Sequence, residues 1–163
     1  MPYGKSSTTE RAALMRSLAA MPAYLRQRFA PLTCEQARIP GPGGAFSPLE
    51  HVWHLADLER EGFAVRIGRL RDEESPRLQD FNGARIARER DYRSRLLREG
   101  LEAFAAARKA NIAALESLPG EAWTRTGTQE GVGAVSLGDM PALMSRHDEE
   151  HRAEIEEWER CQT

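Results

Sequence analysis

The chain has 163 residues, 40% hydrophobic and 29% charged, which is the size and composition of one folded domain with a substantial core. Its formal net charge of −2 lacks the basic excess of general nucleic-acid binders, so no nucleic-acid partner is expected. Acidic residues interrupt the basic clusters, which are therefore expected to be solvated helix faces. These clusters are Arg66, Arg69 and Arg71, and Arg85, Arg88 and Arg90.

The sequence contains no apolar stretch near the ~20 residues that cross a bilayer, so no membrane partner is expected. The N-terminus has no apolar segment after its charges, which argues against a secretory signal. Cys34 and Cys161 are too few for a disulfide framework and lie outside any ligand motif, so they are interpreted as incidental. We expect a cytoplasmic protein in which residues 1–163 form a single domain and residues 1–9 are a polar lead-in.

Apolar periodicity predicts four long helices and no pair of strands. The first helix is predicted from Thr8 to Phe29, where leucines and a methionine recur at helical spacing. Ser7 and Glu10 have the spacing of a capping box, which satisfies free amides at a helix start. Pro22 lies inside this pattern and is expected to kink or divide the helix, because it lacks a backbone donor.

The second helix is predicted to begin where Ser47 can cap, Pro48 suits the first helical position and Glu50 completes a capping box. Its main apolar stripe is Leu49, Val52, Trp53, Ala56, Phe63, Ile67 and Leu70. Residues 71–83 are polar and are predicted to be a loop. Its length favours a crossover over a short turn to an antiparallel neighbour.

The third helix is predicted from about Asp91 to Leu118, with residues 85–90 as a further turn of uncertain boundary. The fourth helix follows a second capping-box pattern, formed by Ser136 and Asp139, and is predicted to extend close to Trp158. Four amphipathic helices separated by Gly- and Pro-rich breaks predict an all-α fold, a four-helix bundle with a long crossover connection.

The four histidines fall in two pairs on the second and fourth predicted helices. His147 and His151 are four residues apart, so their side chains stand about 5–6 Å apart on one face, a spacing suited to one metal ion. They lie within an apolar stripe and are expected to point into the bundle. The alternative is a pair of neutral, hydrogen-bonded core histidines without metal. A third ligand would come from His51 or His54, and periodicity does not decide between them.

Two segments resemble signatures of the DinB-like superfamily (DinB/YfiT-like). Residues 47–59, SPLEHVWHLADLE, resemble its second-helix signature, a Ser-capped helix that carries a ligand histidine. Residues 147–155, HDEEHRAEI, resemble its fourth-helix signature. The resemblance implies a four-helix bundle and a metal site formed by His54, His147 and His151. His51 then becomes either a residue that supports a ligand from behind or a surface residue, and the surface interpretation is preferred.

The resemblance also implies a divalent cofactor, and imidazole ligands accept zinc, nickel or iron. Three nitrogen ligands leave coordination positions open, as in catalytic sites. Asp148 and Asp57 are expected to orient ligand imidazoles from behind, with Asp148 the better match to the family pattern.

The implied function is that of a metal-dependent enzyme acting on a small-molecule substrate, with a low-molecular-weight thiol as cosubstrate. Such an enzyme would be a thiol-dependent S-transferase or isomerase. The alternatives are a metal-dependent hydrolase and a non-catalytic, metal-stabilised binding or stress-response module. A homodimer is common in the family and is compatible with the Leu- and Met-rich helix faces.

Overall fold

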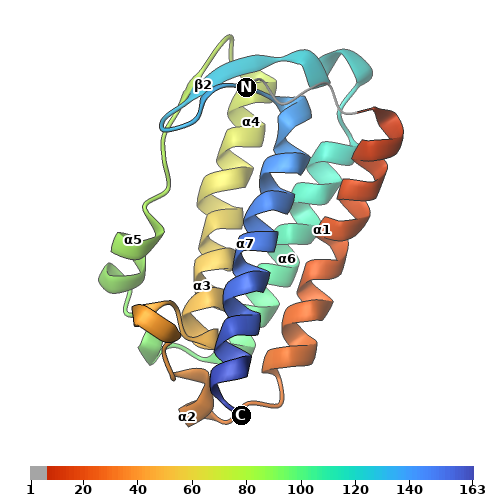
Figure 1. Ribbon diagram of the computed structural model, residues 1–163. Helices are drawn as coiled ribbons and strands as arrows, with labels where there is room; N and C mark the ends of the chain where they lie inside the picture. Colours follow the sequence, from red (N-terminus) through yellow and green to blue (C-terminus); the bar gives the residue numbers. More distant parts are fainter. Residues whose placement is uncertain (1–6) are drawn as a thin grey trace.

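The computed structural model describes residues 7–163, and four long helical rods lie side by side in it (Figure 1). The expected polar lead-in falls mainly on residues 1–6, which lie outside the described residues. The short helical elements are α2 (Cys34–Ala37), α5 (Gly83–Glu89) and the 3₁₀ turns Pro42–Gly44, Tyr92–Ser94, Gly120–Thr124 and Leu137–Asp139. None of the helices in the described part of the chain is long and apolar enough to cross a bilayer.

Helix α1 (Thr8–Phe29) has the predicted bounds, and both hydrogen bonds of the Ser7–Glu10 capping box are present. Pro22 lies within the helix without dividing it. The buried side of α1 carries Leu18, Met21 and Leu25, all fully buried. This side packs against α6 (Leu97–Glu116) and α7 (Met140–Cys161).

The second rod runs from α3 (Pro48–Asp57) through a π-helical segment (Leu58–Phe63) into α4 (Ala64–Asp72). The predicted cap is confirmed, since Ser47 accepts from the Glu50 amide and Glu50 accepts from the Ser47 amide. In a π-helix each backbone hydrogen bond joins residues five positions apart, one more than in an α-helix. Such segments are frequent at functional sites. From Leu49 to Asp57 every residue except Glu50 is buried, because α6 packs on one side of α3 while α5 and the Tyr92–Ser94 turn cover its outer side.

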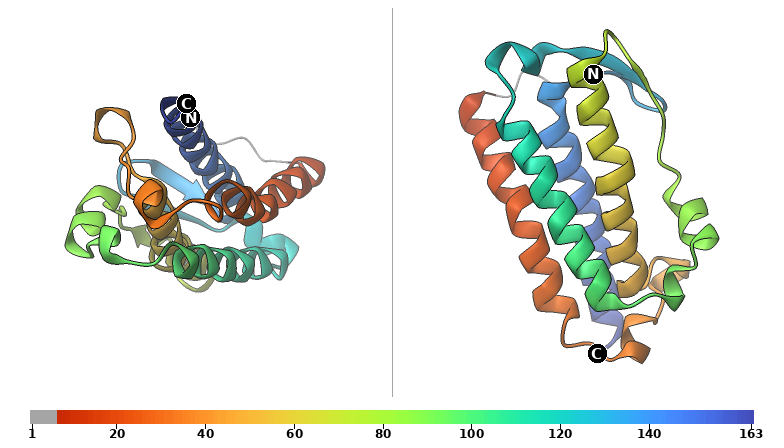
Figure 2. Two further views of the ribbon diagram at one scale, coloured as in Figure 1. Left: turned by 90° about the horizontal axis from the view of Figure 1, so that it is seen from below. Right: turned by 180° about the vertical axis from the view of Figure 1, so that it is seen from behind.

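The predicted long crossover is confirmed. The chain leaves α4 at one end of the bundle, passes along the outside through α5, and enters α6 at the opposite end, so α4 and α6 run in the same direction (Figures 1 and 2). The predicted start of α6 near Asp91 was wrong. Asp91 has a φ of 46°, a left-handed conformation that a helix cannot continue through, and α6 begins at Leu97.

The prediction that the chain has no strand pair was also wrong. A small sheet covers one end of the bundle, with β1 (Arg77–Leu78) parallel to β2 (Thr126–Gln129) and β2 antiparallel to β3 (Gly133–Ser136) (Figure 1). The register pairs Leu78 with Gln129 and Thr128 with Ala134. The strands are too short to show alternation of polar and apolar residues. The sheet nevertheless ties the crossover to the segment that precedes α7.

Helix α7 follows the confirmed capping box of Ser136 and Asp139 and ends at Cys161, slightly beyond the predicted Trp158. Its buried residues include Met144, Ile155 and Trp158. Helix α7 packs against α1, and side chains on its inner face meet those of α3 in the middle of the bundle (Figure 1). That meeting point contains the histidines.

Candidate metal centre

Two helices supply all four histidines, His51 and His54 from α3 and His147 and His151 from α7. The rings of His54, His147 and His151 face one another, with centroid separations of 4.5–5.5 Å. The exposed fractions are 7% for His54 and His151, while His147 is partly exposed. The i, i+4 spacing in α7 therefore delivers two rings to one point, as the sequence predicts.

The Nε2 atoms of these three histidines converge. His147 Nε2 lies 3.5 Å from His54 Nε2 and 3.2 Å from His151 Nε2. Two nitrogens each ~2.1 Å from one ion, at octahedral or tetrahedral angles, stand about 3.0–3.4 Å apart. The 3.2 Å separation lies in that range and the 3.5 Å separation is just above it. One ligand atom from each of the three residues lies within 4.8 Å of the others.

The histidines of this cluster are held neutral, which is the form that binds metal. Burial lowers the pKa of His54 to about 4, opposed by the charge of Asp57. Burial, followed by the charge of His54, lowers the pKa of His147 to about 3. The pKa of His151 is also strongly lowered by burial and then by the neighbouring rings. Each ring therefore presents a free lone pair at neutral pH.

His54 is enclosed from the side away from the triad. Gly83, the first residue of α5, lies so close that a Cβ there would meet Cε1 and would stand 2.6 Å from Nδ1. Phe46 and Phe81 pack against the same ring, with centroids 5.3 and 6.0 Å away. The buried Nδ1 of His54 has no hydrogen-bond partner among the described residues. The ring is thus fixed by packing, with its Nε2 directed at His147.

The donor set fits a divalent ion. Three neutral imidazoles with converging lone pairs repel one another unless protons or a cation lie between them, and a metal satisfies all three at once. The second cluster within metal-binding distance, His51, His151 and Glu154, includes a half-exposed carboxylate and shares His151 with the first. Only the first cluster joins three imidazoles.

The interpretation of His51 as a surface residue was wrong. His51 is 1% exposed, and its Nδ1 lies 2.8 Å from Nδ1 of His151. One proton is shared in such a contact. If His151 coordinates through Nε2, its Nδ1 carries the proton and donates it to His51, the arrangement that fixes a ligand tautomer. Periodicity missed this role because His51 lies off the apolar stripe of α3.

The two aspartates expected behind the ligands have other partners. Asp57 accepts from Tyr92, Arg60 and Arg90, and Asp148 receives a two-pronged ion pair from Arg108. No hydrogen bond from either carboxylate to a histidine is found in residues 7–163. Asp148 and Asp57 therefore brace the helices that carry the ligands, and His51 occupies the place behind His151.

Arg108 was not singled out as a site residue, yet it is the buried centre of a network beside the triad. Its guanidinium is 1% exposed and binds Asp148 on α7, Glu59 in the π-helical segment and the Leu18 carbonyl on α1. Asn111 also donates to Glu59. The network joins all four long helices just beyond the histidines. Only the long-range geometry reveals it, since its members are scattered along the sequence.

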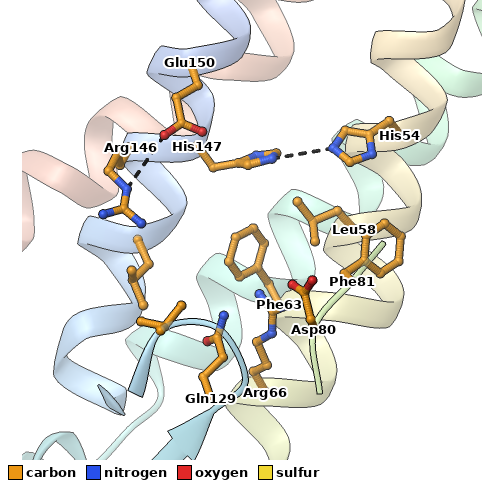
Figure 3. A pocket seen from close by; sticks show the side chains of 12 residues that line it. His54, Leu58, Phe63, Arg66, Asp80, Phe81, Gln129, Arg146, His147 and Glu150 are labelled. Carbon is orange, nitrogen blue, oxygen red and sulfur yellow. Dashed lines mark hydrogen bonds and ion pairs between the residues drawn. The ribbon is translucent and has the colours of Figure 1, made fainter. Parts of the chain in front are cut away.

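A cavity of about 170 Å³ opens beside His54 and His147 (Figure 3). Apolar side chains line part of it, with polar groups at both ends. The lining residues are His54, Leu58, Phe63, Arg66, Asp80, Phe81, Gln129, Val132, Leu143, Arg146, His147 and Glu150. The triad thus forms one wall of a space that a small molecule can enter.

Arg66 departs from the expectation of a solvated basic face. Arg69 and Arg71 are exposed and paired with Glu73 and Asp72, as expected. Arg66 is 7% exposed and reaches into the cavity instead. The sequence offers no signal for this difference, because all three arginines lie within two turns of helix.

Comparison with known proteins bears on the fold and the family. Residues 17–155 match the model of the DinB superfamily. The chain is also similar to the solved structure of YfiT from Bacillus subtilis, with a TM-score of 0.90 and 21% sequence identity, over 99% of this chain and 93% of that one. YfiT is described as a probable metal-dependent hydrolase with an unusual four-helix bundle topology. No curated protein matches the chain. The likeness to YfiT confirms the predicted four-helix bundle.

Proposed function

The chain belongs to the DinB superfamily, and on that premise we propose that it is a divalent-metal-dependent hydrolase of small molecules. The observation that carries the proposal is the convergence of three neutral imidazole nitrogens on the wall of an open cavity. A closed structural site would need a fourth protein ligand, whereas three ligands leave room for water and substrate. The description of YfiT as a probable metal-dependent hydrolase supports the same class of reaction.

His54, His147 and His151 would hold the ion, which on chemical grounds can be zinc, nickel or iron. When bound, the ion supplies Lewis-acid chemistry: it makes water a nucleophile at neutral pH and polarises the bond to be cleaved. His51 holds the tautomer of His151 through the contact between their Nδ1 atoms. Leu58 and Phe63 keep one side of the cavity dry.

Proton transfer needs an acceptor near the ion. The carboxylates of Asp80 and Glu150 line the same cavity, which makes them the groups to test in that role. Glu150 forms an ion pair with Arg146, with 3.9 Å between Oε1 and Nε. Their replacement by the corresponding amides would lower the turnover number while leaving the bound metal in place.

The first experiment measures the metal content of untagged protein by mass spectrometry. We expect near-stoichiometric metal in the wild type and in a control with an exposed substitution, Arg98→Ala. We expect loss of metal in His54→Ala, His147→Ala and His151→Ala. Retention of metal in all three variants would contradict the assignment of the ligands.

The second experiment identifies the reaction. The metal-loaded protein is supplied with small esters and amides in ¹⁸O-labelled water, with and without a low-molecular-weight thiol. Incorporation of ¹⁸O into the product acid without thiol supports hydrolysis. Turnover that requires thiol and incorporates no ¹⁸O would instead identify the thiol-dependent transferase or isomerase. Tight metal binding without any turnover would point to the non-catalytic module.

A further inference from the structure

The cavity contains a buried cation, Arg66, that forms no ion pair with the described residues. Arg66 is 7% exposed, and no hydrogen bond or ion pair within 4.0 Å joins its guanidinium to any residue in the range 7–163. Burial lowers the pKa of Arg66, and the more distant charge of Asp80 offsets that effect only in part. The guanidinium lies against the Phe63 ring in a cation–π contact, with Cζ 5.4 Å from the ring centroid. Arg108, buried to a similar degree, is neutralised by two carboxylates. A guanidinium buried without an anion is unfavourable, which indicates a site for one.

A second polar group points to the same place. Gln129 in β2 is 7% exposed, and its buried Oε1 has no hydrogen-bond partner among the described residues. Figure 3 shows Gln129 and Arg66 together at the end of the cavity away from His54 and His147. Phe63 lies between that end and the two histidines. The cavity therefore has two polar ends, one at the triad and one at Arg66, separated by apolar side chains.

We propose that Arg66 binds the carboxylate of a small substrate whose reactive group lies at the histidine triad. The proposal rests on the function proposed above and names the substrate class of the same site. A guanidinium matches the two oxygens of a carboxylate through paired N–H donors. The side-chain N–H of Gln129 can donate to the carboxylate, which leaves its Oε1 free to accept from a donor on the substrate.

Charge and size restrict the substrate further. Asp80 and Glu150 also line the cavity, and they oppose the entry of a doubly charged anion such as phosphate more than that of a singly charged carboxylate. A volume of about 170 Å³ accommodates only a few heavy atoms between the two polar ends. The substrate class is therefore a short carboxylic acid that carries an amide or ester.

Butyrate and butyramide test the site, because they share a shape and differ in charge. Binding to the ¹⁵N-labelled full-length chain is followed by NMR titration, with zinc bound and after removal of metal by a chelator. We expect butyrate to bind in both states and butyramide to bind at least about tenfold more weakly. Equal binding of the two, no saturable binding of butyrate, or tighter binding of inorganic phosphate would overturn the proposal.

Two matched variants locate the anion. Arg66→Gln is expected to weaken butyrate binding to the metal-free chain at least about tenfold, and Arg146→Gln, at the exposed mouth, less than about threefold. The melting temperature of ligand-free Arg66→Gln should not fall, because the variant removes an unpaired buried charge. Wild-type butyrate affinity in Arg66→Gln would refute the assignment. Since the metal-free chain is tested by binding alone, failure of the proposed hydrolysis leaves this result unaffected.

Discussion

Replacement of His51 by alanine tests whether this residue supports a metal ligand. The 2.8 Å contact between the Nδ1 atoms of His51 and His151 is buried, so its loss leaves a donor or acceptor of His151 without a partner. Such a loss costs about 1–3 kcal/mol. Removal of a residue that supports a metal ligand typically lowers metal affinity about 10–100-fold, which corresponds to a similar free energy. We expect His51→Ala to bind zinc about 10–100-fold more weakly than the wild type.

Competition with a chromophoric chelator at pH 7.5 measures this affinity on metal-stripped protein whose fold is verified by circular dichroism. His51→Asn is the matched control, because its Oδ1 can accept the hydrogen bond while the ring is lost. We expect His51→Asn to bind within about threefold of the wild type. A zinc affinity of His51→Ala equal to that of the wild type would refute the reasoning. So would loss of metal in Glu154→Ala with retention in His54→Ala, which would place the ion in the second cluster.

Three further outcomes are expected from packing, charge and protonation. Gly83→Ala places a methyl group against the His54 ring and should cost about 1–3 kcal/mol of stability, with weaker zinc binding. Gly68→Ala, inside α4 where a Cβ meets nothing within 4 Å, should instead stabilise by about 0.5–1 kcal/mol in urea unfolding and leave the zinc titration unchanged. Arg108→Met leaves two buried carboxylates without their cation and should lower the free energy of unfolding by about 3–5 kcal/mol in a urea titration, unlike Arg98→Met at an exposed site. The folded-state pKa of His54 is about 4 against an ordinary 6.5, so the unfolded state binds more protons between these pH values. The stability of the metal-free protein should therefore fall as the pH drops from 6.5 towards 4, by up to about 1.4 kcal/mol per pH unit for each such histidine, and a constant free energy of unfolding over that range would contradict this.

The parts of the fold that depend on local spacing were predictable. Each of the three predicted capping boxes lies where a hydroxyl and an acid three residues later can meet, and Ser7, Ser47 and Ser136 all form one. The convergence of His147 and His151 follows from helical spacing in the same way. The assignment of His54 came from the likeness of residues 47–59 to a family signature, because spacing alone left His51 equally eligible.

The parts that depend on distant contacts were not predictable. β1 pairs with residues about fifty positions later, and its two residues carry no strand pattern of their own. Arg66 and Arg69 have similar neighbours in the sequence, yet Arg66 lines the cavity together with Gln129, whereas Arg69 is exposed and pairs with Glu73. The buried position of His51 likewise depends on α7, which lies nearly a hundred residues away.

The π-helical segment determines which residues of the second rod face the same cavity. His54 and Arg66 are 12 residues apart, and in an uninterrupted α-helix that separation, at about 100° per residue, would turn them about 120° away from each other. A segment that absorbs one additional residue leaves about 11 effective steps, or roughly 20°, and both side chains then face the same cavity. Deletion of one residue between Leu58 and Phe63 would leave His54 and Arg66 about 11 residues apart in a regular α-helix, still roughly 20° from each other, so both side chains would keep facing the cavity. The π-helical segment thus accommodates one additional residue without turning Arg66 away from the ligands of the metal.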